Sequence, residues 1–293
     1  MTLTAAIETP SGKGAGDENF PVGSLLLPAK LRPHVATFYR FARAIDDIAD
    51  NPDLSADDKV ARLSRFEAAI NGTETGDPAL ETAHKMRASL RETRVTAKHC
   101  TDLIAAFKQD AVKLRYASWD ELMGYCALSA NPVGRYLLDL HGEAQKIYAL
   151  SDALCSALQV LNHLQDCQDD YRNLDRVYLP GVWMKSSGID VRVLSRDFNT
   201  PGLRRVLNLC LDEVDDLLLT ARLLPKRLSS RALAMESAVI LRLALRLSEL
   251  LRARDPLAAR VALSRFDFAG CGIRGVSSVL YRRLRPKPAR QGR

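Results

Sequence analysis

The stretch Gln159-Val160-Leu161-Asn162-His163-Leu164-Gln165-Asp166-Cys167-Gln168-Asp169-Asp170 combines apolar residues at helical spacing with a row of polar ones. On a helix, Gln159, Asn162, Asp166 and Asp170 share one face, with neighbouring Cβ atoms about 5–6 Å apart. Like charges four residues apart destabilise an isolated helix by about 0.2–0.5 kcal/mol. One such pair alone does not indicate a bound cation, but its repetition on a second apolar helix does.

A second acidic stretch, Asp46-Asp47-Ile48-Ala49-Asp50, repeats this spacing earlier in the chain. Its outer members share one helical face, and Arg43 lies three residues before Asp46. Oxygen ligands without His or Cys in the row suit Mg²⁺ better than zinc. Because Mg²⁺ is usually held by one or two carboxylates plus substrate phosphates, we expect two facing aspartate helices to hold a diphosphate through Mg²⁺.

The alternative for any one acidic pair is a solvated helix face. Asp212-Glu213-Val214-Asp215-Asp216 is a third acidic cluster, and no Asn or Gln row precedes it. We interpret this third cluster as surface. The scattered histidines form no recognisable catalytic motif with serine or cysteine, so nucleophilic catalysis is not indicated.

Composition and periodicity favour one all-α domain. The chain has 293 residues, a formal charge of +7, 47% hydrophobic and 26% charged residues, which excludes wholesale disorder, and only 6% aromatic residues. No convincing strand pattern interrupts the helical spacing. Helices are expected over 30–49, 56–71, 79–92, 97–114, 119–129, 132–141, 144–172, 202–222, 229–252 and 256–265, with the longest irregular stretch at 180–201.

The six cysteines form no C-x-x-C pair, so free thiols in a reducing compartment are expected. No secretion signal and no run of 18 uncharged apolar residues is visible, which predicts a cytoplasmic protein, soluble or peripheral to a membrane. Residues 274–293 carry basic residues and no acid. This segment is either a solvated end or a contact with anionic lipid. It lacks aromatic residues beyond Tyr281, so nucleic-acid binding is not expected.

Three motifs in order resemble the squalene/phytoene synthase family, whose members process prenyl diphosphates head to head. They are Asn19–Pro28, Glu121–Gly134, and Gln159–Asp170 followed by Arg176-Val177-Tyr178-Leu179-Pro180. Order and spacing agree from about residue 17 to 182. The resemblance implies an isoprenoid synthase fold, a single helical domain over 17–272 with a central apolar cavity. A flexible arm, 1–16, would precede it, and a basic tail, 273–293, would follow.

The resemblance also implies roles for individual residues. The metal ligands would be Asp46, Asp50, Asn162, Asp166 and Asp170. The catalytic groups would be the four aspartates of this set, together with Tyr178. The substrate-binding residues, which meet the diphosphate or line the cavity, would be Phe20, Tyr39, Arg43, Asp47, Tyr125, Gln159 and Arg176.

Within the family, the Asn-Phe-Pro-Val start and the second aspartate motif look most like the bacterial hydroxysqualene branch of the hopanoid pathway. That branch ionises presqualene diphosphate and lets water capture the product cation, so Mg²⁺ and no NADPH are expected. Many relatives have Glu where this chain has Asp169. The alternatives are a condensing presqualene diphosphate, dehydrosqualene or phytoene synthase acting on two prenyl diphosphates, and a non-catalytic assembly or binding protein. The oligomeric state stays open.

Overall fold

The computed structural model describes residues 26–284, so the expected arm, 1–16, and Phe20 lie outside the described residues. This part of the chain is helical and contains no strand, only an isolated bridge between Arg115 and Val177. The expected all-α class is therefore confirmed. The helices are α1 (Arg32–Asp50), α2 (Ala56–Asn71), α3 (Glu81–Thr93), α4 (Lys98–Val112), α5 (Trp119–Ser129), α6 (Asn131–Leu140), α7 (Tyr148–Gln165), α8 (Cys167–Leu174), α9 (Gly181–Ser186), α10 (Pro201–Ala221), α11 (Leu224–Arg227), α12 (Arg231–Ala253) and α13 (Arg265–Leu284).

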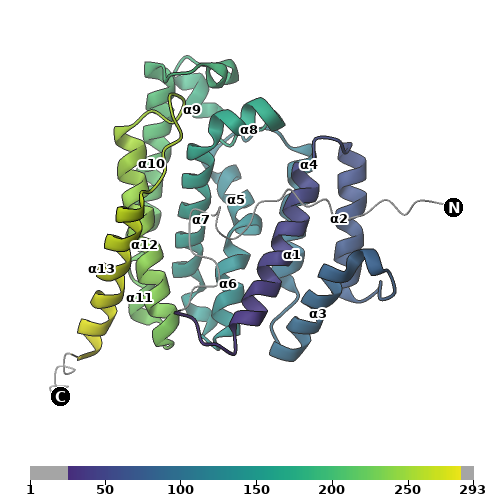
Figure 1. Cartoon of the computed structure of the whole chain (residues 1–293). Coiled ribbons are helices and arrows are strands. Elements are labelled where there is room, and N and C mark those ends of the chain that lie inside the picture. The colour runs from purple at the N-terminus through teal and green to yellow at the C-terminus, as the bar shows by residue number, and fades with distance from the viewer. Residues whose placement is uncertain (1–25, 285–293) are drawn as a thin grey trace.

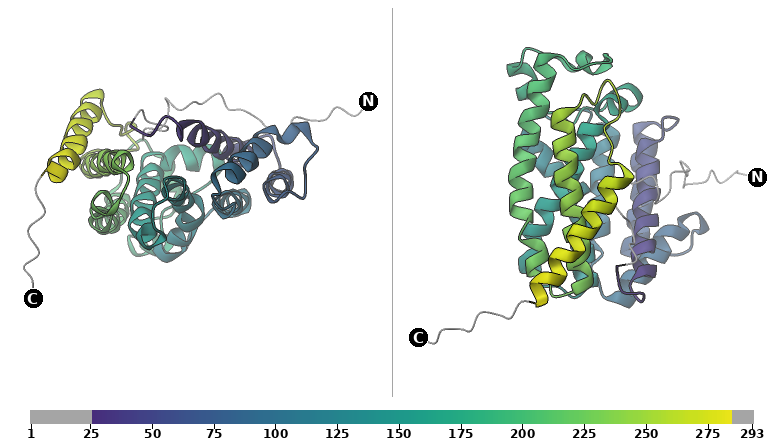
Figure 2. Two further views of the ribbon diagram at one scale, coloured as in Figure 1. Left: turned by 90° about the horizontal axis from the view of Figure 1, so that it is seen from below. Right: turned by 60° about the vertical axis from the view of Figure 1, so that its left-hand side comes forward.

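The long helices stand side by side as a bundle (Figure 1). α2 and α3 lie at one edge and α13 at the other, with α7 between α1 and the pair α10 and α12. The end-on view in Figure 2 shows α13 outside α12, away from the middle of the bundle. Within residues 26–284, no helix is both long enough and apolar enough to cross a membrane.

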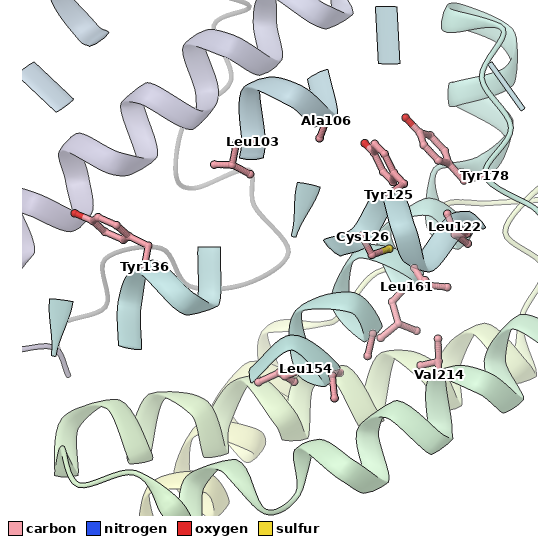
Figure 3. Close-up of a cluster of buried hydrophobic side chains, with 14 of the residues drawn as sticks. Leu103, Ala106, Leu122, Tyr125, Cys126, Tyr136, Leu154, Leu161, Tyr178 and Val214 are labelled. Atoms are coloured by element: carbon pink, nitrogen blue, oxygen red, sulfur yellow. The ribbon is translucent and has the colours of Figure 1, made fainter. Parts of the chain in front are cut away.

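One continuous apolar core joins the helices. Figure 3 shows part of it, where Leu161 of α7 lies close to Val214 of α10, and Leu154 lies further along α7. All three side chains are buried, as are Leu122 and Cys126 of α5 on the other side of α7. The core is built mainly from Leu, Ala and Val at helical spacing, and this packing holds the polar ends of α1 and α7 in place.

Side-chain caps fix where several helices begin. Ser118 accepts a hydrogen bond from the Glu121 backbone N–H at the start of α5, as its capping-box sequence predicts. Ser55, Thr200 and Ser230 do the same for α2, α10 and α12. Each cap satisfies a backbone N–H that has no partner within its helix.

The expected single helix over 144–172 is wrong, because the chain bends at Asp166, between α7 and α8. The backbone hydrogen bonds nevertheless continue across the bend. The Asp166 N–H donates to Asn162 O at 3.0 Å, and the Asp170 N–H donates to Asp166 O at 2.8 Å. The i to i+4 hydrogen-bond spacing that links Asn162, Asp166 and Asp170 is therefore kept across the bend.

The C-terminal part also differs from expectation. Residues 256–264, expected to be helical, are not, and α13 begins at Arg265. The reason is a capping box: Ser264 Oγ accepts from the Asp267 N–H at 3.1 Å, while Asp267 Oδ2 accepts from the Ser264 N–H at 2.9 Å. The boundary expected at residue 272 consequently falls inside a helix. α9 likewise lies inside the stretch expected to be irregular.

Candidate active site

An apolar cavity of about 380 Å³ lies between α1, α6, α7 and α12. Its wall is formed mostly by Leu, Val, Phe and Ala side chains. One row from α1 is different, because Tyr39, Arg43 and Asp46 bring polar groups to it. The central apolar cavity expected from the sequence is therefore present, and two of the predicted diphosphate contacts and one predicted metal ligand lie on its wall.

The close packing of α6 on α7 depends on a glycine in this wall. A Cβ atom at Gly134 would lie 2.3 Å from Ser151 Oγ and 2.6 Å from Cys155 Sγ, closer than real side chains approach. Gly134, at the end of the second predicted motif, thus lets two helices approach at the cavity.

Two aspartates of the first acidic stretch are bound to the arginine that precedes it. Arg43 Nη1 lies 2.9 Å from Asp46 Oδ2, and Arg43 Nη2 lies 3.0 Å from Asp47 Oδ1. Burial, together with the negative charge of Asp50, raises the pKa of Asp46 to about 8, although Arg43 opposes the shift. The free site therefore disfavours full ionisation of this pair, and a cation bound there would relieve the repulsion.

The second aspartate pair also has basic neighbours. Arg260 Nη2 lies 3.2 Å from Asp166 Oδ1, and His163 Nδ1 lies 3.8 Å from Asp170 Oδ2. Burial raises the pKa of Asp166, and Arg260 opposes that shift. Arg260 was not among the predicted residues. It lies in the segment between α12 and α13 that was expected to be helical, and nothing in the sequence pattern links it to Asp166.

Arg176, which follows the second acidic stretch in sequence, binds α1 and α4. Its Nη1 lies 2.5 Å from Asp50 Oδ1, its Nη2 donates to Ala49 O at 2.8 Å, and its Nε donates to Asp110 O at 3.2 Å. Each of the four outer aspartates, Asp46, Asp50, Asp166 and Asp170, thus has a basic side chain within 4 Å. These guanidinium and imidazole groups lie where a metal ion would bind the carboxylates. A metal ion would therefore compete with them for the carboxylate oxygens.

A buried aspartate lies beneath this acidic end. Asp110 of α4, which is 2% exposed, accepts hydrogen bonds from both predicted tyrosines, Tyr125 at 2.6 Å and Tyr178 at 3.0 Å. Figure 3 shows the two phenols side by side, with their hydroxyl groups pointing the same way. Tyr178 also stacks on His163, with ring centroids 3.6 Å apart. Burial raises the pKa of Asp110 to about 6, against the effects of Arg176 and both tyrosines.

Asp110 was missed from the sequence. The only signal was an acid in the last turn of the helix that became α4. Tyr125 was expected to line the cavity, but it is not among the residues that form the cavity wall described above. Its hydroxyl is drawn instead to the buried Asp110 carboxyl.

The predicted ligand row begins on α7 with Gln159 and Asn162, passes the bend at Asp166 and ends on α8 with Asp170. Gln159 Nε2 lies 3.2 Å from His163 Nε2, so this amide packs against the imidazole. Within residues 26–282, no group of three or more Asp, Glu, His or Cys side chains lies close enough together to hold a metal ion. Two separate pairs still fit Mg²⁺, which needs only one or two carboxylates where phosphate oxygens complete its shell. The raised pKa of Asp46 supports this fit.

Comparison with known proteins gives consistent matches. The squalene/phytoene synthase family model matches residues 14–267. Hydroxysqualene synthase of Rhodopseudomonas palustris is 40% identical over 96% of this chain and 95% of that protein, and the enzyme of Zymomonas mobilis is 38% identical over 92% and 91%. The crystal structure of squalene synthase HpnC from Alicyclobacillus acidocaldarius superposes with a TM-score of 0.69 at 30% identity, covering 79% of this chain and 87% of that one. A dehydrosqualene synthase in complex with ligand, 19% identical, shares the fold with a TM-score of 0.72, over 90% and 93% of the chains.

Proposed function

Because this chain belongs to the squalene/phytoene synthase family, we propose that it is a hydroxysqualene synthase. Relatives with this name match more than nine tenths of the chain at 37–40% identity. The reaction begins with ionisation of presqualene diphosphate and ends when water captures the rearranged cation. The structural observation that carries the proposal is the apolar cavity whose wall includes Arg43 and Asp46.

The aspartate pairs are the proposed Mg²⁺ ligands. Asp46 and Asp50 on α1 would hold metal on one side of the site, and Asn162, Asp166 and Asp170 would hold it on the other. When bound, Mg²⁺ withdraws negative charge from the leaving diphosphate. Substrate phosphate oxygens would complete the ligand set, which fits a site built from separate pairs rather than one cluster of acids.

Arginines of the chain supply the remaining positive charge for the diphosphate. Arg43 already lies on the cavity wall, bound to Asp46 and Asp47, and Tyr39 lies one turn before it. Arg260 reaches Asp166 from the segment before α13. A planar guanidinium can exchange a carboxylate partner for phosphate oxygens without losing its hydrogen bonds. We assign both arginines to binding the diphosphate as it leaves.

Tyr125 and Tyr178 hold the lone pairs of their hydroxyl oxygens in fixed directions near the aspartates. Both phenol protons are donated to Asp110, so each hydroxyl oxygen presents only lone pairs to other groups. Such an oxygen can stabilise a nearby cation through its lone pairs, but it has no proton available to donate. Tyr178 takes this role in the proposed reaction, and Asp110 positions its hydroxyl.

The cavity wall controls access of water to the cation. Apolar side chains keep bulk water away from a reactive carbocation. Ser151, Glu236 and Ser237 are buried polar residues on the same wall, and they provide hydrogen-bonding groups for a single bound water. Capture requires only that the water oxygen bonds to the cationic carbon and that one of its protons leaves.

Product analysis tests the proposed function directly. Purified full-length protein with Mg²⁺ and presqualene diphosphate should release diphosphate and form hydroxysqualene, whether or not NADPH is present. In water enriched in oxygen-18, the product should carry the heavy oxygen. A protein that only condenses two farnesyl diphosphates would be one of the condensing synthases instead. Absence of any diphosphate release would contradict both functions.

A further inference from the structure

We propose that the outer face of α13 is a docking surface for an anionic lipid bilayer. α13 lies at the edge of the bundle, outside α12 (Figure 2). Three contacts on its inner side hold it there. Gly275 lies so close to α12 that a Cβ atom would be 2.9 Å from the Val239 backbone. Arg246 Nε donates to Asp267 Oδ1 at 2.8 Å, and Arg282 Nη2 donates to Pro225 O at 2.7 Å.

The opposite face of α13 is apolar and exposed. Phe266 is 90% exposed, Ile273 70% and Tyr281 60%. Residues 7 and 15 positions apart fall within about 80° of each other around a helix, so these three side chains form one stripe. Ala269 and Ser277, which fall between them, are also exposed but small. A large aromatic residue that is almost wholly exposed on a fixed helix indicates a surface that another apolar phase covers.

The charges around the stripe identify that phase. Arg265 and Arg274 are exposed on α13, on either side of the stripe. Asp267 is the one acidic residue in α13, and it is already bound to Arg246 and to the cap at Ser264. An apolar stripe bordered by arginines, with its acid neutralised, matches a bilayer surface that carries anionic headgroups. A second copy of the chain would bring arginines against arginines.

The proposed reaction gives this surface a use. This step rests on the proposed function, in which the product is a C30 alcohol that dissolves in a bilayer and not in water. A helix that lies in the interfacial plane would keep the cavity close to the phase that receives the product.

Vesicle binding of the full-length protein tests the inference without any substrate. The binding constant of the protein, measured by co-sedimentation, should be about tenfold higher for vesicles of equal parts phosphatidylcholine and phosphatidylglycerol than for vesicles of phosphatidylcholine alone. The double variant Phe266→Ser with Ile273→Ser should lose most of this binding, and Arg274→Glu should weaken it and reduce its salt dependence. The matched control is Leu219→Ser, on α10, where Leu219 is 60% exposed; it should bind as wild type does.

Two results would overturn the inference. One is binding of the double variant at the wild-type level. The other is a wild-type dimer in sedimentation analysis that the double variant loses, which would assign the stripe to a second copy. Circular dichroism checks that the variants are folded. Turnover of presqualene diphosphate in detergent should be unchanged in them, so loss of vesicle binding is distinguishable from failure of the proposed reaction.

Discussion

Arg176 Nη1 lies 2.5 Å from Asp50 Oδ1, so the segment after the second aspartate pair is bonded to the helix that carries the first. The same guanidinium donates to the carbonyl oxygens of Ala49 and Asp110. Its planar fork meets acceptors from two helices, α1 and α4, at once. This contact sets how α1 and the segment after α8 approach each other around the site.

Arg176→Lys should separate geometry from charge. Lysine keeps the positive charge but cannot reach the same three acceptors. We expect diphosphate release to fall about tenfold or more. The free energy of unfolding should fall by about 1–3 kcal/mol, because buried carbonyl groups lose their donor. Urea unfolding and a diphosphate-release assay measure the two effects.

A nearby arginine provides the control. Arg172 is more exposed and pairs with the exposed Asp197. Arg172→Lys should change stability by no more than about 0.5 kcal/mol and leave turnover nearly unchanged. Equal behaviour of the two lysine variants would mean that the Arg176 fork does not organise the site.

Asp46→Asn should abolish turnover without harming the metal-free fold. Burial and Asp50 already disfavour the charge on this carboxyl, so its removal costs the metal-free protein little. We expect at least about a hundredfold lower diphosphate release at saturating Mg²⁺, and an unfolding temperature without metal that is no lower than that of wild type. Chelation of Mg²⁺ with EDTA should silence the wild-type enzyme in the same assay.

The third acidic cluster provides the matched control. Asp212 is 65% exposed and pairs with Arg252 on the surface, as the sequence interpretation expected. Asp212→Asn should retain wild-type turnover and its Mg²⁺ dependence. Full activity of Asp46→Asn, or an equal loss in both variants, would contradict the assignment of Asp46 to the metal.

Arg260→Gln should weaken substrate binding more than metal binding. Arg260 pairs with Asp166 and is the cation that we assign to the leaving diphosphate on that side. We expect KM for presqualene diphosphate to rise about tenfold, which is about 1.4 kcal/mol. The Mg²⁺ concentration for half-maximal rate should not rise, because glutamine no longer competes for Asp166. Arg254, an exposed arginine six residues earlier, provides the control, and Arg254→Gln should leave KM unchanged. A higher Mg²⁺ requirement in Arg260→Gln would point to a role in metal binding instead.

Local patterns predicted most of the helices and the two aspartate pairs. Helical spacing and caps are properties of neighbouring residues, so α1, α2, α5, α10 and α12 lie close to their expected ranges. The third acidic cluster could be assigned to the surface on the same grounds. Local patterns could not predict which helices pack together, because the partners of Asp46 and Asp166 depend on tertiary packing.

The residues that were missed are those whose role comes from distant partners. Asp110 meets Tyr178 across 68 positions of sequence, and no motif connects them. α13 was missed because Gly270, Gly272 and Gly275 lower the helix propensity of its sequence. In the structure Gly275 instead permits close packing on Val239, so tertiary contact outweighs local preference.

Asp110 should make the stability of this protein depend on pH between about 4 and 6. Its folded-state pKa is raised from the ordinary 3.8 to about 6 by burial. In that interval the folded carboxyl keeps a proton that the unfolded chain has lost, so the free energy of unfolding falls as pH rises. Above about pH 6 this carboxyl no longer makes the free energy of unfolding depend on pH. Asp110→Asn cannot titrate. Urea unfolding at several pH values should show the wild type losing about 2–3 kcal/mol relative to this variant across the interval.

Tyr178→Phe tests the cause of the effect. The phenol donates to Asp110 and supports its ionised form, so removing that donor should raise the folded-state pKa further and extend the pH-dependent interval upward. Stability at pH 4, where the carboxyl is protonated in the folded state, should change least. Parallel pH profiles for wild type and Asp110→Asn would show that the carboxyl titrates alike in both states, and Asp110 would then be no special anchor for the two tyrosines.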